Sequence, residues 1–188
     1  MPKLIEFNTD RLQLRQWCLA DREPFSRLNA DAKVMAYFSS PLDRAASDTL
    51  ADRCRSLITE RGWGFWAVET RDTHAFIGFV GLHIPSDVLP FSPCVEIGWR
   101  LAGDYWGRGL ATEAAKGALQ VGFEELDLPE IVSFTVFSNS RSRRVMERLG
   151  MRDTSTVFEH PAIAEGHPLR VHCLYRLSRE NWRLLKCI

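Results

Sequence analysis

Apolar residues recur along the chain first with the period of a strand and then with that of a helix. Alternation over 9–15, with Leu12 and Leu14 apolar, predicts a half-buried strand. Helical spacing follows over 20–28 and, after the turn at Pro41, over 44–61. Two β-rich stretches, 63–69 and 75–84, are separated by a polar turn and predict a hairpin. The first half therefore reads as a strand, two surface helices and two strands.

The second half alternates strands with helices. After a loop over 85–93, residues 95–101 alternate again and lead through a glycine-containing turn into an amphipathic helix from Leu110 to about Asp127, which Pro129 ends. The remaining elements are a strand over 130–137, a helix capped by Ser138-Asn139 and closed near Gly150, strands over 151–158 and 169–177 around a loop at 160–168, and a short tail from Glu180. This order predicts one α/β (α+β) domain over 1–188 with a mixed sheet.

Composition excludes several classes of protein. The chain has 188 residues, with 24 Lys+Arg against 24 Asp+Glu, and 45% of its residues are hydrophobic, so neither a polycation nor a disordered chain is expected. No apolar run approaches the roughly 18 residues that a membrane span requires, and Glu6 interrupts what would be a signal-peptide core. We expect a cytoplasmic protein. The five cysteines are scattered without a Cys-x-x-Cys pair, which predicts free, mostly buried thiols and no metal centre.

The loop Gly107-Arg108-Gly109 has the composition of an anion site. It follows a strand and opens a long helix, so backbone N–H groups and the positive end of the helix dipole would favour a pyrophosphate. ATP and NAD motifs fit poorly, because Gly-Lys-[Ser/Thr] is missing and Thr112 stands where a dinucleotide fingerprint has Gly or Ala. A plain structural turn is the alternative. Between 138 and 152 five arginines stand against one glutamate, which suits several phosphates or is simply a solvated face: Arg141, Arg143, Arg144, Arg148 and Arg152.

The segment Trp106-Gly107-Arg108-Gly109-Leu110-Ala111-Thr112-Glu113-Ala114 resembles the acetyl-coenzyme A loop of the GNAT N-acetyltransferase superfamily, in the branch that includes ribosomal-protein N-terminal (alanine/serine) acetyltransferases. Segments 9–15, 96–101 and 139–151 agree with it in the right order. Trp106 departs from the wider superfamily, where Gln or Arg is commoner. The resemblance implies a mixed, mostly antiparallel sheet of about seven strands, splayed at its centre and flanked by about four helices.

The resemblance also implies a role for individual residues. The backbone of Trp99, Arg100 and Leu101 would pair with the pantetheine arm of acetyl-CoA like an added strand. Asn139 would bond the pantetheine, although it is also a good helix cap, and Ser142 would lie beside the thioester sulfur, although a serine is ordinary in a first helical turn. The loop residues that would hold the pyrophosphate, after Trp106 at its start, are Gly107, Arg108, Gly109, Leu110, Ala111 and Thr112.

Direct attack of an amine on a thioester requires a neutral amine and a proton for the departing thiolate. An α-amino group with a pKa near 7.7–8.0 needs only a modest base, whereas a lysine near 10.4 is harder to deprotonate. Glu96, on the strand before the loop, is the candidate base, acting directly or through a water; the alternative is an exposed or ion-paired glutamate. Ser142 is the candidate proton donor, and a main-chain N–H near Trp99 would polarise the carbonyl.

Two aromatic groups admit a structural or a functional interpretation. Three histidines, with Glu159 and Glu165 nearby, have a spacing that matches no common metal site: His160, His167 and His172. The resemblance implies instead that their segment borders the acceptor pocket. A second group is expected in the core: Trp63, Phe65 and Trp66.

Together these observations predict an acetyl-CoA-dependent N-acetyltransferase, acting on a protein or peptide N-terminal amine. A small-molecule amine such as an amino sugar, polyamine or amino acid is the alternative acceptor, and a non-catalytic acyl-CoA-binding module is the alternative class. Nucleic-acid binding is disfavoured because no aromatic platform accompanies the arginines, and no membrane association is expected. Homodimerisation is left open.

Overall fold

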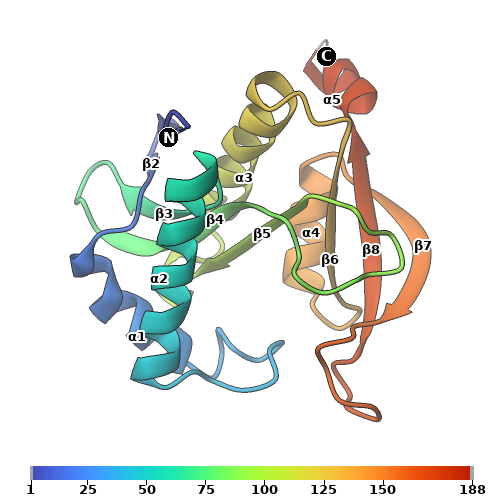
Figure 1. The fold of residues 1–188 in the computed structure, drawn as a ribbon, viewed down its shortest axis with the longest axis horizontal. Helices are drawn as coiled ribbons and strands as arrows, with labels where there is room; N and C mark the ends of the chain where they lie inside the picture. Colours follow the sequence, from blue (N-terminus) through green and yellow to red (C-terminus); the bar gives the residue numbers. More distant parts are fainter. Residues whose placement is uncertain (1, 187–188) are drawn as a thin grey trace. The chain divides into compact units, whose positions relative to one another are not determined.

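The computed structural model describes residues 2–186, so Cys187 lies outside the described residues. The elements are β1 (Phe7–Asn8), β2 (Leu12–Arg15), η1 (Leu19–Asp21), α1 (Arg22–Ala30), α2 (Arg44–Arg61), β3 (Phe65–Thr70), β4 (Phe76–His83), β5 (Glu96–Leu101), η2 (Gly103–Tyr105), α3 (Leu110–Gln120), η3 (Val121–Glu125), β6 (Glu130–Val136), α4 (Ser140–Arg148), β7 (Arg152–Glu159), β8 (Val171–Ser178) and α5 (Arg179–Lys186) (Figure 1). The strand order is β1-β2-β3-β4-β5-β6-β8-β7, a mixed α/β arrangement as predicted. Within this range no helix has the length and apolar character of a membrane span.

The chain divides into two compact units, which we describe separately. The first unit comprises the chain up to Leu82 together with Gly98–Gly117, and the second comprises His83–Ile97 together with the chain from Ala118 onward. β5 begins in the second unit and ends in the first.

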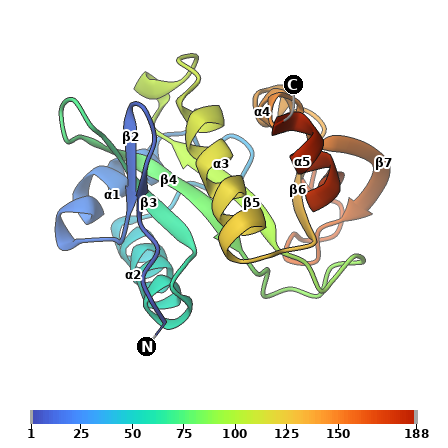
Figure 2. The same ribbon diagram turned by 90° about the horizontal axis from the view of Figure 1, so that it is seen from above.

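In the first unit the strands pair antiparallel, with Leu12 opposite Thr70 and Phe65 opposite Gly81. Figure 2 shows α1 and α2 on one face of these strands and the first part of α3 on the other. The predicted helix over 44–61 is confirmed, because Asp43 accepts a hydrogen bond from Ala46 N at its start and Gly62, with φ of 85°, ends it.

Aromatic packing makes the core of the first unit. Trp66 is fully buried and its ring meets Phe7 edge to face at 5.3 Å, while its indole N–H donates to the carbonyl of Ile5. The core prediction is therefore confirmed for Trp66, whereas Trp63 and Phe65 are half-buried.

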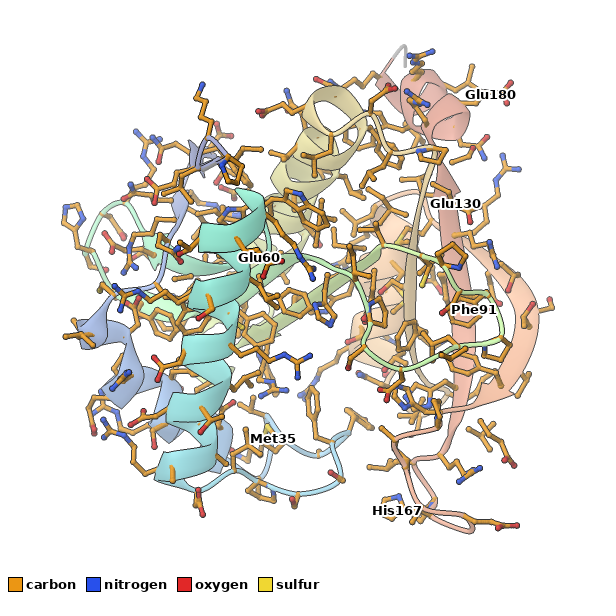
Figure 3. The ribbon with its side chains drawn as sticks, viewed as in Figure 1. Met35, Glu60, Phe91, Glu130, His167 and Glu180 are labelled. Atoms are coloured by element: carbon orange, nitrogen blue, oxygen red, sulfur yellow. The ribbon has the colours of Figure 1, made fainter. Side chains whose placement is uncertain are left out.

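In the second unit β6 lies parallel to the start of β5, with Glu96 opposite Val132, and antiparallel to β8, whose other neighbour is β7. A buried cluster fills the space beside these strands: Leu89, Val132, Phe158 and Leu174. Phe91 packs on Phe158 at 5.0 Å between ring centroids (Figure 3). The same figure places Glu130 at the start of β6.

Two boundaries differ from the sequence prediction. The helix expected to reach Asp127 is α-helical only to Gln120 and continues as a wider π-type turn over Val121–Glu125. The tail expected from Glu180 is the helix α5 instead, whose Trp182 stacks on Phe123 at 5.6 Å. A helix of eight residues is stabilised by such packing rather than by its own propensity, so its pattern gave little signal.

Candidate active site

The glycine loop of the first unit has an open, left-handed backbone. Gly107 and Gly109 have φ of 74° and 77°, a region that other residues adopt only at a cost of roughly 1–2 kcal/mol. A Cβ atom at Gly107 would meet nothing within 4 Å, and at Gly109 only Arg11 at 3.7 Å. The N–H groups of the first turn of α3, which begins at Leu110, have no acceptor within the helix. Backbone donors without helical acceptors, beside glycines with open space around them, suit a pyrophosphate.

An ion pair fixes this loop to the start of the chain. Glu113 accepts from the Thr9 hydroxyl at 2.6 Å, from Arg11 N at 2.8 Å and from Arg11 Nε at 2.6 Å, and Arg11 Nη1 donates to the carbonyl of Arg108 at 3.0 Å. Burial would raise the pKa of Glu113, but the hydrogen bonds from Thr9 and Arg11 outweigh it and the pKa lies below its ordinary value. The early segment of the resemblance therefore holds the loop rather than contributing to chemistry. Sequence reasoning missed this link, although Thr9, Arg11 and Glu113 all stand within the quoted motifs.

The end of β5 is held by its neighbours in the same unit. A Cβ at Gly78, which has φ of 138°, would lie 2.1 Å from the carbonyl oxygen of Arg100, so only glycine allows β4 to approach so closely. The indole N–H of Trp106 donates to the carbonyl of Leu101 at 2.8 Å and ties the loop to the strand. Trp99 is half-buried. The predicted pantetheine contact of the Trp99–Leu101 backbone stays a prediction.

In the second unit Asn139 and Ser142 lie together at the start of α4. Asn139 Oδ1 accepts from Ser142 N at 3.2 Å, and Asn139 Nδ2 donates to Ser142 Oγ and to Thr135 Oγ1, both at 3.0 Å. Both amide protons of Asn139 are thus used inside the protein, and one lone pair of Oδ1 remains for a ligand. Because Ser142 Oγ accepts from Asn139, its own proton is left to donate outward.

Glu96, also in the second unit, carries a carboxyl group without a partner. Within residues 2–186 no hydrogen bond or ion pair reaches it, and burial raises its pKa to about 8 although the residue as a whole is partly exposed. The strand around it is firmly held: Val132 N donates to the carbonyl of Val95 at 2.9 Å, and the buried hydroxyl of Ser133 donates to the carbonyl of Ile97 at 2.9 Å. A fixed carboxyl with a pKa near neutrality is the usual form of a general base.

Two histidines of the second unit belong to an aromatic cluster. His160 and His172 lie 5.1 Å apart between ring centroids, next to Phe134 and Phe158, and burial lowers the pKa of both. Figure 3 shows His167 in the loop before β8. Among the described residues no group of three or more His, Cys, Asp or Glu side chains is placed to hold a metal ion. Four of the five arginines near α4 are exposed: Arg141, Arg144, Arg148 and Arg152.

A strand followed by a glycine loop and a helix N-terminus, whose first N–H groups have no acceptor in the helix, is the arrangement of an α/β protein that takes a phosphate-bearing ligand. An acetyltransferase (GNAT) domain model matches residues 11–152. The chain belongs to the GNAT family and is an acetyl-CoA-dependent N-acetyltransferase.

Relatives and solved structures agree with this assignment. The chain is 32% identical to "Uncharacterized protein YkkB" of Bacillus subtilis, over 79% of this chain and 86% of that protein. It is 30% identical to "FsC-acetyl coenzyme A-N(2)-transacetylase" of Aspergillus fumigatus, over 93% and 77%. A GNAT-family acetyltransferase structure from Bacillus anthracis shares the fold with a TM-score of 0.78 at 24% identity, over 94% and 99%. "Putative ribosomal N-acetyltransferase YdaF" of Bacillus subtilis matches at 33% over 56% of this chain and 55% of that protein.

Proposed function

We propose that this protein, acting as one domain, transfers the acetyl group of acetyl-CoA to the α-amino group of a protein or peptide. The observation that carries the proposal is the unpartnered carboxyl of Glu96 with its pKa of about 8. An α-ammonium group has a pKa near 7.7–8.0, so its proton passes to this carboxylate with almost no change in free energy. A lysine near 10.4 loses its proton to the same base at a cost of about 3 kcal/mol. Glu96 therefore favours an α-amine.

The remaining roles follow from contacts within each unit. When bound, acetyl-CoA supplies the activated acetyl group, and the N–H groups from Gly107 to Thr112 hold its pyrophosphate. Glu96 takes the proton of the acceptor ammonium, and the freed nitrogen lone pair forms the new bond to the acetyl carbon as the carbon–sulfur bond breaks. The nitrogen loses its second proton as the amide forms. The departing thiolate takes up a proton from the Ser142 hydroxyl, which recovers its own from the proton that the nitrogen releases, while Asn139 keeps the hydroxyl in that orientation. Asn139 is thus a positioning residue in this proposal.

A second acceptor class has one observation in its favour. Among the curated relatives, the one named as a transacetylase of FsC, a name that mentions no protein substrate, is similar over most of both chains, whereas YdaF, named for ribosomal N-acetylation, matches little more than half of each. A small-molecule amine is therefore the second candidate.

The test compares amines in one assay of thiol release from acetyl-CoA. A peptide without lysine and with a free N-terminus is expected to be acetylated; the same peptide with a blocked N-terminus is the control. Turnover of small amines alone would replace the peptide proposal with the second candidate. Binding of acetyl-CoA without turnover of any amine would leave a non-catalytic acyl-CoA-binding module.

A further inference from the structure

Arg100, near the end of β5, is partly exposed as a residue but has a buried Nε donor and a charge that the protein does not neutralise. Within the described residues its guanidinium makes one hydrogen bond, from Nη1 to Asn29 Oδ1 at 2.7 Å, and no ion pair. Its Nε atom is buried and has no hydrogen-bond partner among those residues. Asn29 is itself fully buried and fixed by a hydrogen bond to Ser47. An unpaired donor on a buried cation is costly in a finished protein interior.

The groups around the guanidinium are neutral. The ring of Phe38 lies 4.0 Å from the guanidinium carbon and the ring of Phe79 lies at 5.4 Å. Burial raises the pKa of the neighbouring Cys54 thiol to about 12, so it carries no charge at neutral pH. Burial also lowers the pKa of Arg100 to about 10, which leaves it protonated under the same conditions. The cation thus lies among aromatic, amide and thiol groups without an anion.

Arg15 of the same unit shows how this fold neutralises a half-buried arginine. Its two terminal nitrogens each donate to Asp21 at 2.8 Å, and its Nε donates to Glu69 at 2.9 Å. Arg100 has no such acid. Because Nη1 is bound to Asn29, the edge formed by Nε and Nη2 remains, and two parallel N–H groups on one edge match the two oxygens of a carboxylate.

We propose that the Nε edge of Arg100 binds a carboxylate of the acceptor, so that the acceptor is an amine which also carries a carboxylate. This inference rests on the proposed function. In the proposed function the phosphates of acetyl-CoA are assigned to the backbone from Gly107 onward, so the acceptor is the remaining source of an anion for this arginine. Phe38, which is 40% exposed, covers one side of the guanidinium. The carboxylate comes either from a small amino acid or from an acidic residue of a peptide.

The first experiment measures selectivity for the carboxylate. Peptides that begin Ala-Glu and Ala-Gln form one pair of acceptors, and 4-aminobutyrate and its amide form the other. The wild type is expected to show a KM roughly 10- to 100-fold lower for the carboxylate member of one pair, which identifies the source. Arg100→Met should remove this preference. Equal KM values for both members of both pairs in the wild type would overturn the proposal.

Two further variants separate binding from a structural role. Arg100→Met should keep or raise the Tm, since an unpaired buried charge is replaced by an apolar chain of similar length; a large loss of Tm with unchanged selectivity would make Arg100 structural. Asn29→Asp places a carboxylate on the fixed Nη1 contact, and we expect a higher Tm with weaker selectivity. Arg144→Met, at an exposed arginine, is the control and should change neither quantity.

Direct binding makes the inference independent of turnover. Glutarate, a dicarboxylate without an amine, is titrated calorimetrically into the wild type and into Arg100→Met. Binding to the wild type with at least tenfold weaker binding to the variant supports the anion site even if no amine is acetylated. Absence of binding to the wild type, or equal binding to both, overturns it while leaving the acetyltransferase proposal standing.

Discussion

Replacing Glu96 with glutamine removes one ionisation and keeps the shape of the side chain. In the wild type, burial raises the carboxyl pKa to about 8, whereas in the unfolded chain it is near 4.3. Between these values the folded protein retains a proton that the unfolded chain has released. The free energy of unfolding therefore falls as the pH rises through this window, and the contribution of the group is most favourable at its acidic end.

The slope in this window is about 1.4 kcal/mol per pH unit. From pH 6 to pH 8 the loss is about 2 kcal/mol, because the slope halves as the pH reaches the folded pKa. For a chain of this size, 2 kcal/mol corresponds to roughly 4–8 °C in Tm. The glutamine of Glu96→Gln does not ionise, so the free energy of unfolding of this variant should not fall with pH on account of position 96. The variant should therefore become more stable than the wild type, by an amount that grows toward pH 8.

Urea unfolding at pH 6, 7 and 8, followed by tryptophan fluorescence, measures this difference. Glu60→Gln is the control, since Glu60 lies exposed on α2 and should follow the pH dependence of the wild type. If the free energy of unfolding has the same pH dependence in the wild type and in Glu96→Gln, the Glu96 carboxyl is not desolvated. The main evidence that Glu96 is the base would then be lost.

The same variant separates catalysis from stability. In the wild type kcat/KM is expected to rise toward pH 8 as Glu96 and the acceptor amine lose their protons. Glu96→Gln should lose roughly 10²–10⁴ in rate, the usual contribution of a general base, with little change in the Kd of acetyl-CoA. A variant that keeps wild-type rates at pH 7 would exclude Glu96 from proton transfer.

Three further substitutions, two of them paired with a control variant, probe the glycine loop and the start of α4. Gly109→Ala and Gly166→Ala impose the same left-handed strain, since both glycines have φ of 77°, and each should lower the Tm by a few degrees; calorimetry should find weaker acetyl-CoA binding only for Gly109→Ala. Ser142→Ala should slow kcat without abolishing turnover, because a thiolate leaves readily, whereas Ser140→Ala, at an exposed position, should leave kcat unchanged in the same thiol-release assay. Glu113→Gln should lower both the Tm and the acetyl-CoA affinity, and equal affinity in a titration would show that the loop does not depend on the ion pair with the start of the chain.

Elements with local start and stop signals could be predicted from the sequence, and those held by distant contacts could not. The helix over 44–61 has a capping Asp43 and a terminal Gly62, so its bounds follow from neighbouring residues. The α5 helix has no comparable signal, because its stability comes from Trp182 stacking on Phe123, 59 positions earlier in the numbering. The π-type turn after Gln120 likewise could not be predicted, because the spacing of apolar residues does not change there.

The same division holds within the candidate site. The loop at Gly107 and Gly109 could be predicted from the sequence, because a backbone with positive φ selects glycine directly. The roles of charged side chains depend instead on what lies around them: a glutamate at position 96 could equally have been ion-paired, and an arginine at position 100 could have faced solvent. Only the structure distinguishes the paired Arg15 from the unpaired Arg100.

β5 thus carries two partly buried ionisable side chains, one acidic and one basic, and neither has a charged partner within the described residues. Proteins retain such costly groups mainly where a ligand compensates them. An acceptor with a carboxylate has the charge opposite to Arg100. Its binding should therefore raise the Tm more than binding of the uncharged amide of the same size. The difference should be lost in Arg100→Met, which a thermal-shift series with the two pairs of acceptors measures.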